Sequence, residues 1–216
     1  MKMDLKSIVR KRYRLINILP FNNRIRARKT KIVNEGAALI KCEIKSRGNN
    51  TIIFRKGAII RNTVIHIYGN NNLVEVGENA SLNYGNIHVE DDGNRVVIGA
   101  GTNICGKTHL ACIEGKSILI GNDCLFSSEI VLRTGDSHSV LDLNGKRINY
   151  SEDIVISDHV WVGYRVSIGK GVVISKNTVI GTGAIVTKSC DEENVVLAGV
   201  PAAVVKSGIN WTTERI

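Results

Sequence analysis

His138 is the side chain in this sequence best suited to acid–base chemistry. It lies in the polar segment Asp136-Ser137-His138-Ser139. An imidazole ordinarily titrates near neutral pH, so it can remove the proton from a hydroxyl group that is otherwise a poor nucleophile. Asp136, or alternatively Asp142, could hold the ring in the required tautomer. A solvated loop histidine is the competing interpretation.

Trp161 is the second candidate, because of its place in a six-residue repeat. A helix requires apolar spacings of three and four, whereas a strict period of six is typical of a β-helix in which each six residues form one flat side of a triangular coil. Trp161 precedes an inward-pointing aliphatic residue and is therefore predicted to point outward, where a large ring needs a binding or packing partner. The aliphatic residues six positions apart are Ile156, Val162, Ile168, Ile174, Ile180 and Val186.

The repeats continue towards the N-terminus with a longer period. The residues that are 22 positions apart are Phe54, Val76, Ile98 and Ile120, and those that follow six positions later are Ile60, Leu82, Ile104 and Phe126. The surplus residues fall in Asn- and Gly-rich segments, which are typical of wide corners with left-handed backbone. We therefore predict an all-β solenoid over residues 32–206, with an excursion loop at 133–153 and a C-terminal cap at 207–216.

Several segments resemble those of a known family, the hexapeptide-repeat acyltransferases. Residues 158–163 (DHVWVG) and 198–202 (AGVPA) are similar to signature segments of its sugar-acetylating members. The segment around His138, together with residues 145–149 (GKRIN), is most similar to bacterial capsular polysaccharide O-acetyltransferases. The resemblance covers about residues 54–206 and implies a left-handed parallel β-helix.

The resemblance also implies the chemistry and the partners. It implies a homotrimer with active sites between adjacent prisms, acetyl-CoA as co-substrate, and no metal. His138 would be the general base, and the indole N–H of Trp161 would bind the oxyanion. The positions that match the family's coenzyme-binding residues are Gly163, Tyr164, Thr182, Thr187, Lys188 and Lys206.

A third column of aliphatic residues suggests where an acceptor could bind. We align Ile67, Val89, Leu110 and Leu132 on one wall, and the residues before the first three are His66, His88 and His109. This alignment predicts a ladder of imidazoles that leads to the excursion, with His109 and His88 as acceptor contacts. Arg147, after the excursion motif, is a further candidate for binding the acceptor. An exposed polar column that keeps the wall soluble is the alternative.

Composition limits the classes of protein that remain. The chain has 216 residues, 43% of them hydrophobic but only 5% aromatic, which suits a thin prism filled by Val and Ile. The five cysteines show no metal-type spacing and are interpreted as reduced thiols of a cytoplasmic protein. No apolar run has the length of a membrane span, and the N-terminus does not resemble a signal peptide.

The net charge of +9 is concentrated in residues 1–31, which contain eleven Lys and Arg and one acid. We predict a short basic helix ending at Pro20, followed by an exposed linker. The helix could pack on the prism or lie on an anionic membrane surface. Nucleic-acid binding is not expected, because no aromatic residues are interleaved with the charge in a stacking pattern.

The function that the sequence favours is acetyl transfer to a sugar hydroxyl of a bacterial surface polysaccharide or its precursor. Acetylation of a small sugar, an amino-sugar nucleotide or an antibiotic is the alternative. A non-catalytic scaffold and a zinc enzyme that uses the three histidines are more remote.

Overall fold

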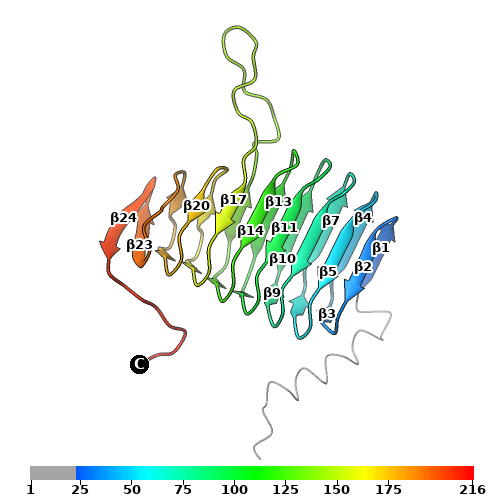
Figure 1. The fold of residues 1–216 in the computed structure, drawn as a ribbon, viewed down its shortest axis with the longest axis horizontal. Coiled ribbons are helices and arrows are strands. Elements are labelled where there is room, and N and C mark those ends of the chain that lie inside the picture. Colours follow the sequence, from blue (N-terminus) through cyan, green and yellow to red (C-terminus); the bar gives the residue numbers. More distant parts are fainter. Residues whose placement is uncertain (1–22) are drawn as a thin grey trace, which may run out of the picture.

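Short strands stack in parallel because each repeat places one aliphatic residue inside a triangular prism and turns at its corners. The computed structural model describes residues 23–216, which form this prism with its axis along the longest dimension of the molecule (Figure 1). Three parallel sheets make its walls. The predicted parallel β-helix is confirmed.

The first wall, sheet A, contains eight strands. They are β1 (Arg24–Arg28), β4 (Glu43–Arg47), β7 (Val64–Tyr68), β10 (Gly85–Val89), β13 (Thr108–Cys112), β16 (Ile130–Arg133), β19 (Ser167–Ile168) and β22 (Ile185–Val186).

The second wall, sheet B, contains seven strands. They are β2 (Lys31–Asn34), β5 (Thr51–Phe54), β8 (Leu73–Val76), β11 (Arg95–Ile98), β14 (Ser117–Ile120), β17 (Ile154–Ile156) and β20 (Val173–Ile174).

The third wall, sheet C, contains nine strands, of which the last is antiparallel. They are β3 (Ala38–Ile40), β6 (Ile59–Arg61), β9 (Ser81–Asn83), β12 (Asn103–Ile104), β15 (Leu125–Phe126), β18 (Trp161–Val162), β21 (Val179–Ile180), β23 (Val195–Gly199) and β24 (Ala202–Ser207).

The wide corners between sheets A and B contain a buried ladder of asparagines. The Asn50 side-chain oxygen accepts a hydrogen bond from the Asn72 amide at 3.0 Å, and the Asn72 oxygen accepts one from the Asn94 amide at 2.7 Å. The Asn94 oxygen accepts the next bond, from the Lys116 amide at 3.1 Å. Each side chain thus satisfies a backbone donor of the next coil, which explains the Asn-rich surplus in the sequence.

The first coil begins earlier than predicted. Residues 24–28, which we predicted as a linker, form β1 and pair in parallel with β4. Alternating basic residues at these positions obscured the strand, because its inward positions hold only Ala27 and Ile25, which is 46% exposed on this terminal coil. The predicted basic helix falls in residues 1–22, outside the described part of the chain.

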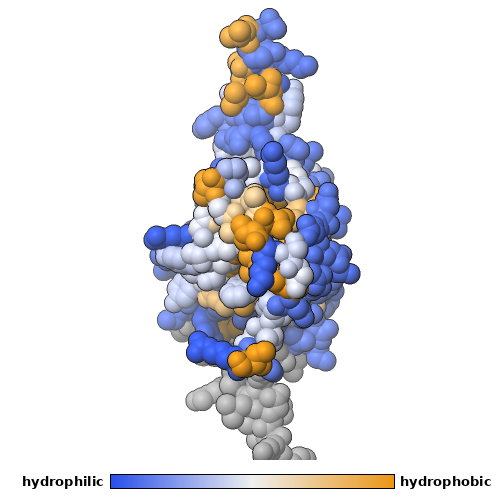
Figure 2. Space-filling model, turned by 90° about the vertical axis from the view of Figure 1, so that its left-hand side faces the viewer, coloured by the Kyte–Doolittle hydropathy of each residue, from blue (hydrophilic) through white to orange (hydrophobic). Residues whose placement is uncertain are grey.

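The excursion leaves the prism between β16 and β17, as predicted, and rises well above the walls (Figure 1). It contains a short hairpin in which Leu141 and Arg147 form an antiparallel bridge. Figure 2 views the molecule along the prism, with the excursion at the top carrying apolar side chains near its tip. These exposed apolar residues are Val140, Leu141, Leu143 and Ile148.

The C-terminal segment first contacts the last coil, where Ile209 and Asn194 exchange hydrogen bonds of 2.9 and 3.0 Å, and then returns to the side of the prism. The Trp211 indole donates a hydrogen bond to the His159 carbonyl at 2.9 Å, and its ring stacks on the His159 imidazole with centroids 4.2 Å apart. His159 itself has a positive φ at a corner between sheets B and C. The segment therefore supports the coil that carries β18.

Candidate active site

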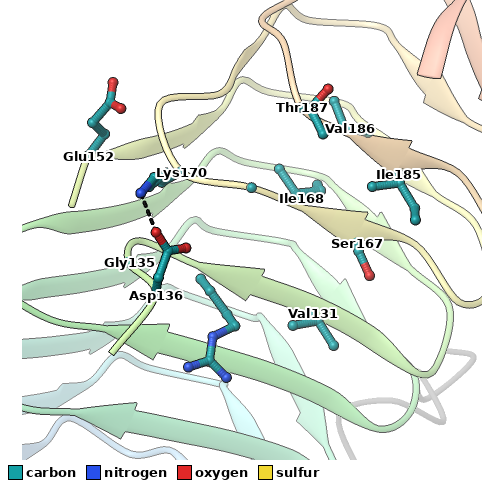
Figure 3. Close-up of a pocket in the computed structure, with 12 residues that line it drawn as sticks. Val131, Gly135, Asp136, Glu152, Ser167, Ile168, Lys170, Ile185, Val186 and Thr187 are labelled. Carbon is teal, nitrogen blue, oxygen red and sulfur yellow. Dashed lines mark hydrogen bonds and ion pairs between the residues drawn. The ribbon is translucent and has the colours of Figure 1, made fainter. Parts of the chain in front are cut away.

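A groove of about 600 Å³ lies on sheet A at the foot of the excursion (Figure 3). Its apolar floor comes from β16, β19 and β22, which contribute Val131, Ile168 and Ile185. Charged residues lie at its rim: Arg133, Asp136, Glu152 and Lys170. An apolar floor beside a few polar groups is typical of a small-molecule site.

The first turn of the excursion is fixed by Asp136. Its carboxylate forms an ion pair with Lys170 (Figure 3). It also accepts a hydrogen bond from the Asn149 side-chain amide at 2.9 Å. The bond from Lys170, and then that from Asn149, lowers the pKa of Asp136. Asn149 also donates to the His138 carbonyl at 2.8 Å, so this one amide ties both strands of the excursion together.

His138 is exposed, and its ring has no hydrogen-bond partner within residues 23–216. The structure therefore does not bring the Asp136 carboxylate onto the imidazole, as the sequence suggested, since Asp136 holds the loop backbone through Asn149 instead. Asp142 binds the amides of Asn144 and Lys146 at the hairpin turn. The imidazole is left free to meet an acceptor.

A second clamp holds the excursion from its other end. The Arg147 guanidinium forms an ion pair of 2.7 Å with Glu114, which also accepts a hydrogen bond from the Ser151 amide at 3.2 Å. The bond from Arg147, and then that from Ser151, lowers the pKa of Glu114 to about 2. Arg147 also lies over the Tyr150 ring, 5.2 Å from its centre. Arg147, predicted to bind the acceptor, is thus engaged in anchoring the excursion.

Sequence analysis missed three residues of these clamps: Glu114, Asn149 and Lys170. Asn149 was within the quoted motif, and its side chain is the link between Asp136 and the His138 backbone. Glu114 and Lys170 lie on other coils, 33 and 34 positions away in sequence from Arg147 and Asp136. The only signal for these two residues is a charge opposite to that of their partner in the excursion, and this match becomes visible only after the coils have stacked.

Trp161 lies on a different wall from the excursion. It belongs to β18 in sheet C, whereas the excursion leaves from the corner between sheets A and B. The side chain is 39% exposed, and its ring centre is 6.0 Å from that of Trp211. Its indole N–H has no hydrogen-bond acceptor among the described residues. His138 and Trp161 of one chain therefore do not face a common site.

The residues predicted to bind coenzyme fall on two corners. Thr187 and Lys188 follow β22, at the corner between sheets A and B, and Thr187 lines the groove. Tyr164 and Thr182 follow β18 and β21, at the corner between sheets C and A. Lys206 lies on the exposed strand β24.

Two of the corner glycines have different physical roles. A Cβ on Gly163 would lie 2.8 Å from the Ile180 carbonyl oxygen, so the close stacking of coils accounts for this glycine. Gly183, next to Thr182, has φ +73°, and a Cβ there would meet no atom within 4 Å. The corner at Thr182 is therefore open to a ligand, whereas that at Gly163 is packed.

The predicted ladder of three histidines is wrong in register. His66 pairs with His88, but His88 pairs with Ala111, and His109 pairs with Asn86. His109 lines a separate groove of about 520 Å³ on the same sheet. Burial, and then the positive charge of Arg133, lowers the pKa of His109. Residues 23–216 contain no group of three or more His, Cys, Asp or Glu side chains that could hold a metal ion.

The fold and the excursion define a class of protein, the hexapeptide-repeat acetyltransferases. No protein-family model matches the chain. Over 186 residues, it is 32% identical to the polysialic acid O-acetyltransferase of Neisseria meningitidis, a match that covers 76% of this chain and 86% of that protein. The solved structure of the polySia-specific acetyltransferase NeuO matches with a TM-score of 0.82 at 32% identity, over 89% of this chain and 88% of that one.

The chain therefore belongs to the family that contains the polysialic acid O-acetyltransferases. A second solved member, the polysialic acid O-acetyltransferase OatWY, matches with a TM-score of 0.70 at 30% identity, over 91% of this chain and 90% of that one. The polysialic acid O-acetyltransferase of Escherichia coli O1:K1 / APEC is 40% identical over 124 residues, which are 57% of this chain and 40% of that protein's length.

Proposed function

We propose that this protein transfers an acetyl group from acetyl-CoA to a sugar hydroxyl of a bacterial surface polysaccharide. The observation that carries the proposal is the excursion, which is clamped at both ends and presents a free imidazole beside the groove on sheet A. The relatives supply the class of acceptor, since two of them are polysialic acid O-acetyltransferases by name.

His138 acts as general base in this proposal. The imidazole takes the proton of the acceptor hydroxyl as its oxygen attacks the thioester carbonyl carbon. A C–O bond forms and the C–S bond breaks, and the imidazolium returns the proton to the leaving thiolate. Asp136 is a positioning residue, because it reaches His138 only through Asn149.

Trp161 of a neighbouring copy stabilises the negative charge that develops on the carbonyl oxygen. Its indole N–H has no acceptor within the described chain, and such a prepositioned donor is typically worth a few kcal/mol in the transition state. A neighbouring copy is needed because β18 and the excursion lie on opposite sides of one prism.

A closed trimer brings these two elements together. One of the two outward columns of sheet B is almost wholly apolar, and its residues in register are Val33, Ile53, Glu75, Val97, Leu119, Val155 and Val173. Packing this flat wall around a three-fold axis buries the column. It also sets the corner between sheets A and B of one copy beside sheet C of the next, which carries Trp161. The apolar tip of the excursion then has a surface to contact (Figure 2).

The coenzyme would lie between two copies. Thr187 and Lys188 of one copy and Thr182, Tyr164 and Lys206 of the next would bind it, the lysines facing its phosphates. The open corner at Gly183 suits a chain that passes close to the backbone. Acetyl-CoA supplies the activated acetyl group, and the protein supplies the base, the oxyanion donor and the positions of both substrates.

Contact with an anionic membrane surface through the basic N-terminal segment remains a separate proposal. The described part of this segment, residues 24–31, contributes Arg24, Arg26, Arg28, Lys29 and Lys31 to the first coil. Residues 23–216 contain no helix with the length and hydrophobicity of a membrane span. A deletion that tests this idea should stop at residue 22, because removing residues 24–28 would remove β1.

The proposal is tested by mass spectrometry of glycans incubated with the protein and acetyl-CoA. We expect polysialic acid to gain 42 Da per acetyl group, a mass fixed by replacement of a hydroxyl hydrogen with an acetyl group, and neutral galactosides to gain little. Acetylation of galactosides alone would favour the small-sugar alternative, and acetylation of neither would overturn the proposed acceptor class.

A further inference from the structure

The corrected register of sheet A reveals a different column from the predicted histidine ladder. The residues that occupy one outward position on successive strands are Arg26, Lys45, His66, His88, Ala111 and Arg133. Five of these six side chains are cationic or imidazole. The column, which we call the sheet A column, runs along the prism from the first coil to the strand that leads into the excursion.

The lower end of the column is a cationic groove. A hollow of about 820 Å³ is lined by Arg26, Arg28, Lys29, Lys45 and Arg47, and no Asp or Glu lines it. None of these five side chains forms an ion pair with a carboxylate in the described chain. Five cations without a carboxylate partner among residues 23–216, gathered around one concave surface, attract a polyanion.

The middle of the column is different, because each imidazole there is paired with a carboxylate and an aromatic ring lies close by. Glu43 binds His66 at 3.2 Å, and Glu90 binds His88 at 2.8 Å. Tyr68 lies close to both imidazoles, with its ring centre 6.3 Å from that of His66 and 5.9 Å from that of His88. These carboxylates would repel a charged group, whereas the imidazoles and the phenol offer hydrogen bonds and ring surface to sugar hydroxyls and C–H groups.

The upper end of the column returns to positive charge at Arg133. Its guanidinium donates to the Ser137 hydroxyl at 3.0 Å, directly beside His138, and it lines the groove at the foot of the excursion. Four strand steps separate Lys45 from Arg133. At about 4.8 Å for each step, the two cationic ends are about 19 Å apart.

We propose that the outer face of sheet A is the docking surface for a linear anionic polysaccharide. The polymer is held by the cationic groove at one end and by Arg133 at the other, and it passes over the Tyr68 region between them. This inference rests on the proposed acetyl transfer and adds where and how the acceptor chain is recognised. A planar membrane fits less well, because the column is narrow, lies partly in a groove and ends at the excursion.

The proposal predicts that acceptor length matters. A chain that spans 19 Å engages both ends, whereas a short chain at His138 meets only Arg133. The second contact is then intramolecular and lowers the apparent KM without changing the chemical step. Raising the salt concentration should remove this advantage, because exposed charges are screened within about 10 Å at 0.1 M salt.

The test compares Lys45→Gln/Arg47→Gln with a control of the same charge change, Lys41→Gln/Lys56→Gln, which removes two exposed lysines at corners outside the column, neither of them ion-paired in the described chain. The substrates are polysialic acid fractions of two lengths, one shorter and one longer than the span of the column. For the first variant, we expect KM for the long fraction to rise about tenfold at low salt, with kcat and the short fraction unchanged. The control should match the wild type with both fractions.

Other outcomes decide against the proposal. Equal changes with both fractions, or no change with either, would overturn the docking surface while leaving acetyl transfer intact. A loss of binding to phosphatidylserine vesicles with an unchanged KM for the long fraction would assign the groove to membranes instead. Failure of the wild type to acetylate either fraction would contradict the proposed function itself, which distinguishes that failure from a failure of the docking surface.

Discussion

The coils below the excursion and those above it are built differently. Below it, paired residues from β5 to β14 in sheet B are 22 positions apart in sequence, as Phe54 and Val76 are, and the strands of sheets A and B have four or five residues. Above it, the spacing falls to 18, as between Ile156 and Ile174, and most strands have two residues. The asparagine ladder is confined to the lower coils and ends at Lys116.

This difference separates two tasks along one solenoid. Wide corners and longer strands give the lower coils broad walls, and sheet A there carries the charged column. The upper coils have tight corners, and most of the residues predicted to bind the coenzyme lie at these corners. The excursion leaves at the change of period, so a polymer on the lower wall and a donor on the upper coils would meet at His138.

The largest effect is expected from His138→Ala, which removes the base at the junction. We predict a fall in kcat of at least about two orders of magnitude, as is usual when a general base is lost. The thermal midpoint should not change, because the ring has no partner in the described chain. Steady-state kinetics and a melting curve check this, with Ser139→Ala as control. Near-normal turnover would remove His138 from the mechanism.

Trp161→Phe should have the next largest effect on activity. The phenyl ring keeps most of the contact with Trp211 and loses the N–H, so we predict a decrease in kcat of about tenfold to a hundredfold with little change in the donor KM. If the protein assembles as the proposed trimer with sites shared between adjacent copies, mixed assemblies of Trp161→Phe and His138→Ala should regain activity. Loss of trimer stability alone would favour a packing role.

Asn72→Leu tests the lower coils by themselves. It removes an acceptor of the Asn94 amide and a donor to the Asp91 carbonyl. Each buried group left without a partner costs about 1–3 kcal/mol, so we expect a clear fall in the free energy of unfolding. The exposed neighbour Asn70→Leu is the matched control for side-chain type and should cost less. Denaturant titration measures both, and equal values would show that the ladder adds little stability.

Glu114→Gln should have the smallest effect, a few-fold loss of kcat/KM as the excursion loosens. Faster hydrogen exchange in residues 136–150 would report that loosening directly. Because the pKa of Glu114 lies below its usual value, its contribution is complete above about pH 4.5 and is lost as the pH falls towards about 2. Wild-type and mutant exchange rates should therefore differ at pH 7 and converge near pH 2. A constant difference across this range would contradict the clamp.

The sequence allowed most of the fold to be predicted, because the interior of a solenoid repeats one type of residue at a fixed period. The excursion was equally clear, since the period stops at Leu132 and resumes near Ile156. The start of the solenoid was missed, because residues 24–28 lie on the first coil and bury no large aliphatic residue.

The histidine ladder failed for a reason specific to strands. Shifting a strand by two residues keeps the same side chains inward, so the apolar pattern could not distinguish Leu110 from Cys112 as the partner of Val89. The structure selects Cys112. The clamps of the excursion were also beyond reach, because Glu114 and Lys170 approach it only after the coils have stacked.

Strand β24 has a consequence for the length of the molecule. A parallel solenoid has no intrinsic end, because each terminal coil offers unpaired amides and carbonyls to a further coil or to a second molecule. β24 runs antiparallel to β23, and the register between them shifts at Val196 and Leu197. An incoming coil would have to match all three sheet edges at once, and the reversed, irregular edge of sheet C prevents this. One hairpin therefore protects the protein against growing end to end into fibres.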